Sequence, residues 1–248
     1  RIFLAVSLLC YVLFVLDREK YGLFEKVDMS WKAWKKHRHI GYAAGFTNTV
    51  EHFGFAALYV FAGLLGTISL GALTIAFTTF GVPFMICYGI AGATAVRVGI
   101  ALGREDRQDM ALAGLCGLAF NGMICLPLMI ILIYFPANIA GLFSTDVVLI
   151  AATTPLIALS AWRLFLDTAQ TVVGNALRGA QDIWMPAIFY IICYSLVMIP
   201  LAYYLTFTLD HGAIGLIECI IVASFLSISL LLSRFLYLTL FKKQPDHD

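Results

Sequence analysis

Long apolar segments, separated by short polar connectors, make up most of this chain. A helix needs about 20 apolar residues to cross the hydrocarbon core of a bilayer. The apolar segments lie at residues 2–16, 40–64, 68–101, 110–134, 147–177, 183–207 and 213–240. This pattern predicts an all-α protein, a polytopic bundle of about seven transmembrane helices. The first segment is short, so we expect it to be a truncated helix.

Two of the segments, 68–101 and 147–177, are longer than one crossing requires. The first contains Pro83 and the second contains Pro155. A proline removes an intrahelical hydrogen bond, and its ring clashes with the preceding turn. We therefore predict bends at these two prolines and interpret them as hinges.

The composition strengthens the membrane interpretation. Hydrophobic residues make up 61% of the chain and charged residues 12%, whereas soluble domains carry about 25% charged residues. The net charge of +1 gives no reason to expect a nucleic-acid partner. The six cysteines lie in apolar segments without a CxxC pair, which favours free thiols. The chain also lacks a glycine-rich phosphate loop and a nucleophile elbow, so an enzyme is not expected.

Basic and non-basic connectors alternate along the chain. The connectors rich in Lys and Arg are 17–39, 103–109, the turn at Arg178 and the tail 241–248. The connectors 64–67, 135–146 and 208–212 contain no Lys or Arg. By the positive-inside rule, the long connector and the C-terminus are cytosolic. Trp31 and Trp34 lie within the basic connector, which is either an anchor on membrane lipid or a solvated loop.

Glu51 lies in the most polar part of any apolar segment. Thr47, Asn48, Thr49 and His52 surround it in the sequence. A charged side chain in hydrocarbon costs about 2.5–3.5 kcal/mol on insertion scales, so such residues mark functional sites by default. Glu51 can hold a proton, or a Na⁺ with help from Asn48 and threonine oxygens; the alternative is a structural hydrogen-bond node. No second His or Cys stands at ligand spacing, so we expect no metal beyond Na⁺ at Glu51 and Asp167.

Three further charges stand out within the apolar segments: Arg163, Asp167 and Glu218. Arg163 and Asp167 are four residues apart, so they share one helix face, which Gln170 continues. Arg163 would keep Asp167 charged at neutral pH, although the pair could also serve structure alone. Glu218 lies within the first two turns of the last helix, where it either lines a cavity or reaches the interface.

Several motifs together resemble one family. They are Glu51-His52-Phe53-Gly54-Phe55, Gly63-Leu64-Leu65-Gly66, Gly89-Ile90-Ala91-Gly92-Ala93-Thr94-Ala95-Val96-Arg97-Val98-Gly99, Phe143-Ser144-Thr145-Asp146, Asp167-Thr168-Ala169-Gln170-Thr171-Val172-Val173-Gly174 and Leu177-Arg178-Gly179. The combination is similar to MATE (multidrug and toxic compound extrusion) transporters of the NorM-like branch. The block from Asp167 to Gly179 is the most specific part of the likeness.

The resemblance implies a twelve-helix protein of two six-helix lobes, of which this chain is the C-terminal half. Residues 1–16 would end the first lobe, 17–39 would be the cytosolic lobe linker, 40–240 the second lobe and 241–248 a cytosolic tail. The missing N-terminal lobe would be its partner. Such proteins are secondary transporters, not enzymes, of the bacterial inner membrane. They need no cofactor besides the coupling Na⁺ or H⁺.

The resemblance also implies a mechanism, namely export of cationic amphipathic drugs by alternating access. Glu51 and Asp167 match the family's ion-coupling carboxylates, and Asn48, Thr74, Gln170, Arg163 and Glu218 are candidate cavity residues. The chain departs from the family at Arg163, often a tyrosine, and at Leu73-Thr74, where a His-Gln pair is common. Arg163 is a tethered cation beside a proposed ion site, which disfavours a free cation there. The alternatives are a lipid-linked oligosaccharide flippase of the same superfamily and a half-transporter that is inactive alone.

Overall fold

The computed structural model describes residues 2–14, 31 and 34–241, which contain helices and no strands. The chain divides between Gly41 and Tyr42 into two compact units. The first contains α1 (Ile2–Phe14). Within the first unit, Arg38 donates a hydrogen bond of 2.6 Å to the carbonyl of Trp31 and stacks its guanidinium 3.6 Å from that ring. Most of the predicted 17–39 connector and the tail 242–248 lie outside the described residues.

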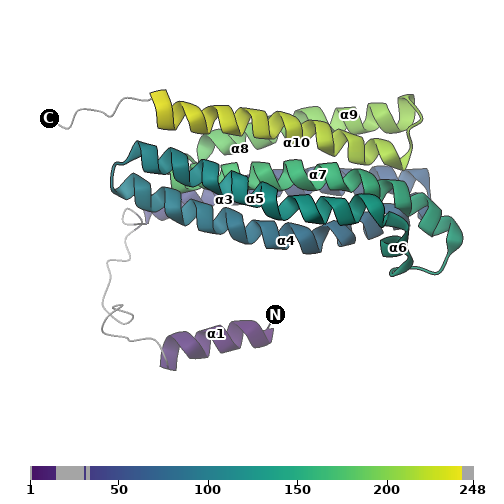
Figure 1. Cartoon of the computed structure of the whole chain (residues 1–248), viewed down its shortest axis with the longest axis horizontal. Helices are drawn as coiled ribbons and strands as arrows, with labels where there is room; N and C mark the ends of the chain where they lie inside the picture. Colours follow the sequence, from purple (N-terminus) through teal and green to yellow (C-terminus); the bar gives the residue numbers. More distant parts are fainter. Residues whose placement is uncertain (1, 15–30, 32–33, 242–248) are drawn as a thin grey trace. The chain divides into compact units, whose positions relative to one another are not determined.

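The second unit is a bundle of long helices (Figure 1). Its α-helices are α3 (Lys35–Leu65, which begins in the first unit), α4 (Thr67–Gly103), α5 (Arg107–Tyr134), α6 (Pro136–Gly141), α7 (Val147–Gly179), α8 (Trp184–Tyr190), α9 (Ile199–Tyr203) and α10 (Ala213–Leu236). Three π-helical segments continue α8, α9 and α10 respectively: η1 (Ile191–Met198), η2 (Tyr204–Thr208) and η3 (Tyr237–Phe241). The apolar segments predicted as helices are therefore helical.

Five described spans are long and apolar enough to cross a membrane: Thr67–Gly103, Arg107–Tyr134, Val147–Gly179, Trp184–Thr208 and Ala213–Leu240. α3 has 31 residues, but it carries the polar stretch around Glu51. Large apolar side chains cover the outside of the bundle; Val82 is 72% exposed and Met123 is 69% exposed. Such a surface is stable against lipid and unfavourable in water.

The two predicted hinge prolines do not break their helices. α4 continues for 37 residues through Pro83, and α7 for 33 residues through Pro155. Pro83 is buried, whereas Pro155 is exposed. Their role as hinges stays a prediction.

The helix between Trp184 and Thr208 changes its winding near Pro200. The π-helical η1 ends at Met198, just before the α-helical Ile199–Tyr203 segment that contains this proline. Because proline has no N–H and its ring crowds the preceding turn, a wider winding is a common adjustment. Tyr190 and Tyr194 stack next to each other there, with ring centroids 5.7 Å apart, and both are buried.

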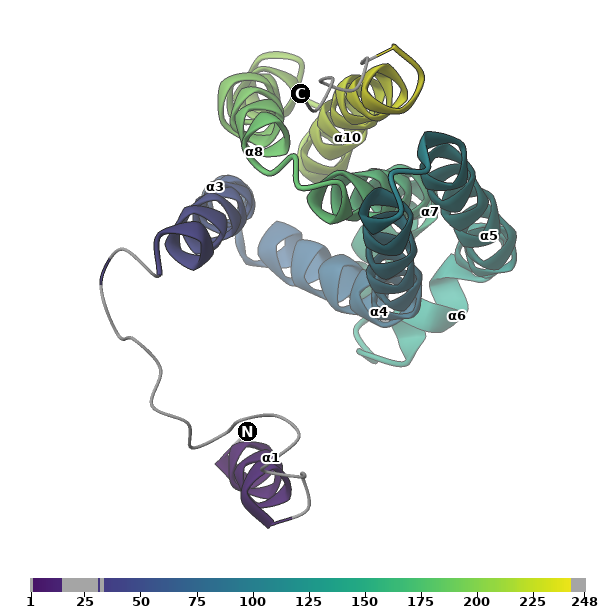
Figure 2. The ribbon, with the colours of Figure 1, turned by 90° about the vertical axis from the view of Figure 1, so that its left-hand side faces the viewer.

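Helix α7 is the centre of the bundle. It packs against α4, α5 and α10, which surround it in the view along the helices (Figure 2). Its close approach to α4 depends on Gly179, because a Cβ there would lie 2.4 Å from the carbonyl oxygen of Ala95. The polar stripe predicted from the sequence for α7 therefore lies in the interior, where Arg163, Asp167 and Gln170 are buried.

The basic ends of the helices meet at one end of the bundle. Gly99 of α4 approaches Gly179, which ends α7 just after Arg178. Arg234, in the last turn of α10, donates a 2.7 Å hydrogen bond to Asp182, which follows α7. Among the described residues, the basic connectors of the sequence thus lie at one end of the bundle, and the connectors without Lys or Arg lie at the other.

Candidate functional site

Asp167 lies on the inward face of α7, with its side chain only 6% exposed. Its Oδ2 accepts a hydrogen bond of 3.0 Å from Nε of Arg163, one turn earlier. Its Oδ1 accepts bonds from Nε2 of Gln170, at 3.2 Å, and from the hydroxyl of Ser224 on α10. Both carboxylate oxygens therefore have partners from the protein. The pairing expected from the i, i+4 spacing is confirmed.

Arg163 is as deeply buried as Asp167, with its side chain 4% exposed. Its guanidinium carbon lies 4.0 Å from the ring centroid of Phe80, 4.4 Å from that of Phe77 and 5.3 Å from that of Phe55. Phe77 and Phe80 belong to α4 and Phe55 to α3. These distances are within the range of cation–π attraction. Arg163 is thus held by one carboxylate and three aromatic faces.

Gln170 connects Asp167 to the π-helical segment. Its Nε2 also donates to the hydroxyl of Tyr194 in η1, a fully buried side chain. On the other side of α7, Asn121 of α5 donates a 3.0 Å bond to the hydroxyl of Thr168. The polar residues after Asp167 therefore link α7 to the helices around it.

Glu51 lies in a different environment, a cavity of about 300 Å³ between α3, α4, α7 and α8. The cavity is lined by Asn48, Glu51, His52, Phe84, Met85, Tyr88, Thr171, Gly174, Asn175, Arg178 and Tyr190. Glu51 is the only carboxylate in this lining. Within the residues that the structure describes, it makes no hydrogen bond or ion pair, although it interacts electrostatically with Asp167, Arg178 and Arg163. Its role as an ion-coupling carboxylate stays a prediction.

The other candidate residues predicted from the sequence lie in different places in the structure. Asn48 joins Glu51 in the cavity lining, and Gln170 joins Asp167. Thr74 is exposed, and its hydroxyl donates a 2.7 Å hydrogen bond to the carbonyl of Leu70 on the same helix. Glu218 is partly exposed and lies 2.7 Å from Nδ1 of His211, in the connector before α10. Thr74 and Glu218 are therefore not part of either group.

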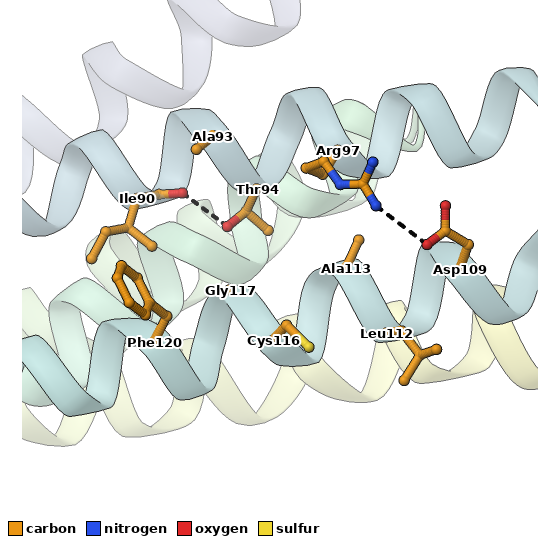
Figure 3. A pocket seen from close by; sticks show the side chains of 10 residues that line it. All are labelled: Ile90, Ala93, Thr94, Arg97, Asp109, Leu112, Ala113, Cys116, Gly117 and Phe120. Carbon is orange, nitrogen blue, oxygen red and sulfur yellow. Dashed lines mark hydrogen bonds and ion pairs between the residues drawn. The ribbon is translucent and has the colours of Figure 1, made fainter.

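A second hollow, of about 420 Å³, lies between α4 and α5 (Figure 3). Small residues line it, among them Ala93, Ala113 and Gly117. At one end Arg97 reaches Asp109 at 3.5 Å, a loose and largely exposed ion pair. Within the described part of the chain, no group of three or more His, Cys, Asp or Glu side chains could hold a metal ion, here or elsewhere.

A match to the MatE family spans residues 43–204, which is most of the bundle. The chain belongs to the MatE family. It is 33% identical over 95% of its length to the "Probable multidrug resistance protein NorM" of Caulobacter vibrioides, and 31% identical over 71% to that of Pseudomonas putida. It covers 50% and 39% of these relatives, so this MatE chain spans about half the length of the curated relatives it matches.

Solved MATE structures share the fold. The eukaryotic transporter AtDTX14 superposes with a TM-score of 0.82 at 18% identity, over 93% of this chain and 52% of that one. A MOP superfamily transporter of Pyrococcus furiosus, described as having a binding pocket of reverse polarity, gives 0.71 at 14% identity, over 82% and 44%. The MatE chain is thus half of a MATE-type transporter fold. Proteins of this family are membrane transporters rather than enzymes.

Several residues around Asp167 and in the cavity of Glu51 could not be identified from the sequence. Phe77 and Phe80 lie in an apolar segment, where phenylalanine carries no signal of its own, and Phe55 belongs to a motif of the family resemblance without a role assigned to it. Ser224 and Tyr194 reach Asp167 and Gln170 from other helices. The sequence predicts a turn at Arg178; the structure places this residue in the last turn of α7, where it lines the cavity of Glu51.

Proposed function

We propose that this chain is the ion-coupling half of a Na⁺- or H⁺-driven exporter of cationic amphipathic drugs, with Glu51 as the carboxylate that carries the coupling cation. The observation that supports this role is the placement of Glu51 in a cavity without a hydrogen bond or ion pair among the described residues. A charge in such a position is costly unless it binds a cation or a proton. The names of the NorM relatives, which are multidrug resistance proteins, support drugs as the substrates.

The coupling follows from competition for one negative charge. A cation gradient loads Glu51 from the outer side, and a cationic drug replaces the ion from the inner side. Each ligand shifts the two states only by its difference in affinity for them. Arg178 in the same lining weakens the hold on any cation, which helps release. Asn48 supplies an amide oxygen that suits Na⁺.

The setting we propose is the bacterial inner membrane, with the basic end of the bundle in the cytosol. The shared position of Arg178 and Arg234 at one end supports this orientation through the positive-inside rule. The remaining lobe would come from outside this chain, and both lobes would enclose the drug.

The experiment is dye uptake into everted vesicles that contain the intact gene product carrying this chain, since export from the cytosol becomes uptake when the membrane is everted. Ethidium or a fluoroquinolone is followed under a Na⁺ gradient and, separately, under a pH gradient. We expect transport with one gradient and its loss in E51Q. Transport under neither gradient would contradict the proposal and favour the flippase, for which lipid-linked sugars are tested next. Unchanged gradient-driven transport in E51Q would contradict the role of Glu51.

A further inference from the structure

We infer that Phe55, Phe77, Phe80 and Asp167 form a binding site for a small organic cation, and that Arg163 of the same chain fills it from within. The guanidinium carbon lies 4.0–5.3 Å from the three ring centroids, and Nε lies 3.0 Å from the Asp167 carboxylate. Aromatic faces combined with one carboxylate are the usual surroundings of a bound ammonium or guanidinium ion.

The site is shaped for charge and aromatic contact rather than for many hydrogen bonds. Nη1 of Arg163 is buried without a hydrogen-bond partner, so the guanidinium does not form the two-pronged contact that an arginine–carboxylate fork allows. Asp167 binds Arg163 through Oδ2, while Gln170 and Ser224 occupy Oδ1. The protein thus presents one carboxylate oxygen to the cation and aromatic faces over the rest.

This environment selects the kind of cation. A phenylalanine ring offers no lone pairs, so it cannot replace the oxygen ligands or water shell of Na⁺. A guanidinium ion is flat, delocalised and weakly hydrated, which suits a dry aromatic cage. The class of ligand that fits here is therefore a small alkylguanidinium rather than an inorganic ion.

The spacing of Arg163 and Asp167 in the sequence explains why the arginine occupies this site. Arg163 and Asp167 are one helical turn apart, so the side chain reaches its own carboxylate without any movement of α7. The rings come from α3 and α4, and their centroids lie 4.0–5.3 Å from the guanidinium carbon. While Arg163 stays in place, an external cation cannot reach Asp167. If the proposed function holds, the coupling cation is then restricted to Glu51.

The test removes the Arg163 guanidinium by substitution and adds a free guanidinium compound in its place. R163A of the intact protein is purified in detergent, and its thermal unfolding is followed with increasing ethylguanidinium. We expect a saturable rise in Tm of about 2–4 °C or more, absent in the wild type and in R163A/D167N. Urea, which is neutral and of similar shape, and NaCl are the matched ligand controls. The readout does not involve transport, so the site can fail while the proposed antiport holds, and the reverse.

Two results would overturn the inference. One is a Tm of R163A that responds to ethylguanidinium no more than the wild type does. The other is an equal response to NaCl, which would show an ordinary carboxylate site. If R163A does not survive purification, the same comparison is made on the yield of monodisperse protein after solubilisation with and without ethylguanidinium. A yield that the ligand leaves unchanged counts against the site as well.

Discussion

The Arg163 guanidinium and the Asp167 carboxylate, one turn apart on α7, pair at 3.0 Å in the interior of the bundle. The pair is the most buried charge contact among the described residues, since the side chains of the other ion pairs are at least 15% exposed. Removing two charges from water is costly, and the cost is offset only by good geometry and additional hydrogen bonds. Gln170 and Ser224 supply such bonds to Asp167.

The two partners of this pair should differ in how much stability their loss costs. D167N leaves a buried guanidinium that cannot lose its proton, so we expect a loss of about 3–5 kcal/mol in the free energy of unfolding. R163M leaves a carboxyl group that can take up a proton and become neutral, so its loss should be smaller. The double variant R163M/D167N should be more stable than D167N alone. Thermal unfolding of the four proteins in one detergent measures the order, and a D167N protein as stable as the wild type would show that the pair contributes nothing.

Glu51 and Glu218 should respond differently to the same change. Glu51→Gln removes the only carboxylate of the cavity lining, and we expect gradient-driven transport to fall at least tenfold with little change in Tm. Glu218→Gln removes a partly exposed contact with His211, an interaction worth about 0–1 kcal/mol, and transport should remain. Uptake into everted vesicles at matched expression measures both. Loss of transport in E218Q would restore the sequence-based alternative that Glu218 lines a cavity.

Tyr194 should be needed for the placement of Gln170. In Tyr194→Phe, the Gln170 amide loses its bond to the phenol and keeps only Asp167. We expect a loss of about 1–3 kcal/mol, because a buried polar group is left with fewer partners. Tyr203→Phe is the matched control, since Tyr203 is 58% exposed and should tolerate the change. Equal melting temperatures of the two variants would contradict the role of the buried bond.

Hydropathy and residue spacing predicted the helices and the contacts within one helix, but not the contacts between different helices. The segment at 147–177 predicted α7, and the i, i+4 spacing predicted the contact of Arg163 with Asp167, because both depend on one helix only. Ser224 and the three phenylalanines could not be predicted, since a uniformly apolar segment shows its depth in the membrane but not its rotation about its axis. The π-helical turns of η1 had only Pro200 as a signal, and a proline does not determine how a helix adjusts to it.

Gly117 should be required for the packing of α5 against α4. A Cβ at Gly117 would lie 2.2 Å from Oγ1 and 2.8 Å from Cγ2 of Thr94, which faces it across the two helices (Figure 3). Thr94 is held by a 2.8 Å bond to the carbonyl of Ile90, so its side chain cannot turn away without losing that bond. Gly117→Ala should therefore cost about 1–3 kcal/mol, as overpacking does.

The matched control for this change is Gly92→Ala on α4, where an added Cβ meets no atom within 4 Å. It should be neutral or slightly stabilising, because alanine is a better helix former than glycine by about 1 kcal/mol. The double variant G117A/T94A removes Oγ1 and Cγ2, the two nearest atoms, and keeps Cβ of residue 94 at 3.0 Å, so it should regain part of the stability lost in G117A. Thermal unfolding of the three variants separates the effects. If G117A and G92A have the same melting temperature, the close approach of α4 and α5 does not constrain the fold. If only G117A has a lowered melting temperature and G117A/T94A has a higher one than G117A, the contact between positions 94 and 117 determines how closely the helices pack.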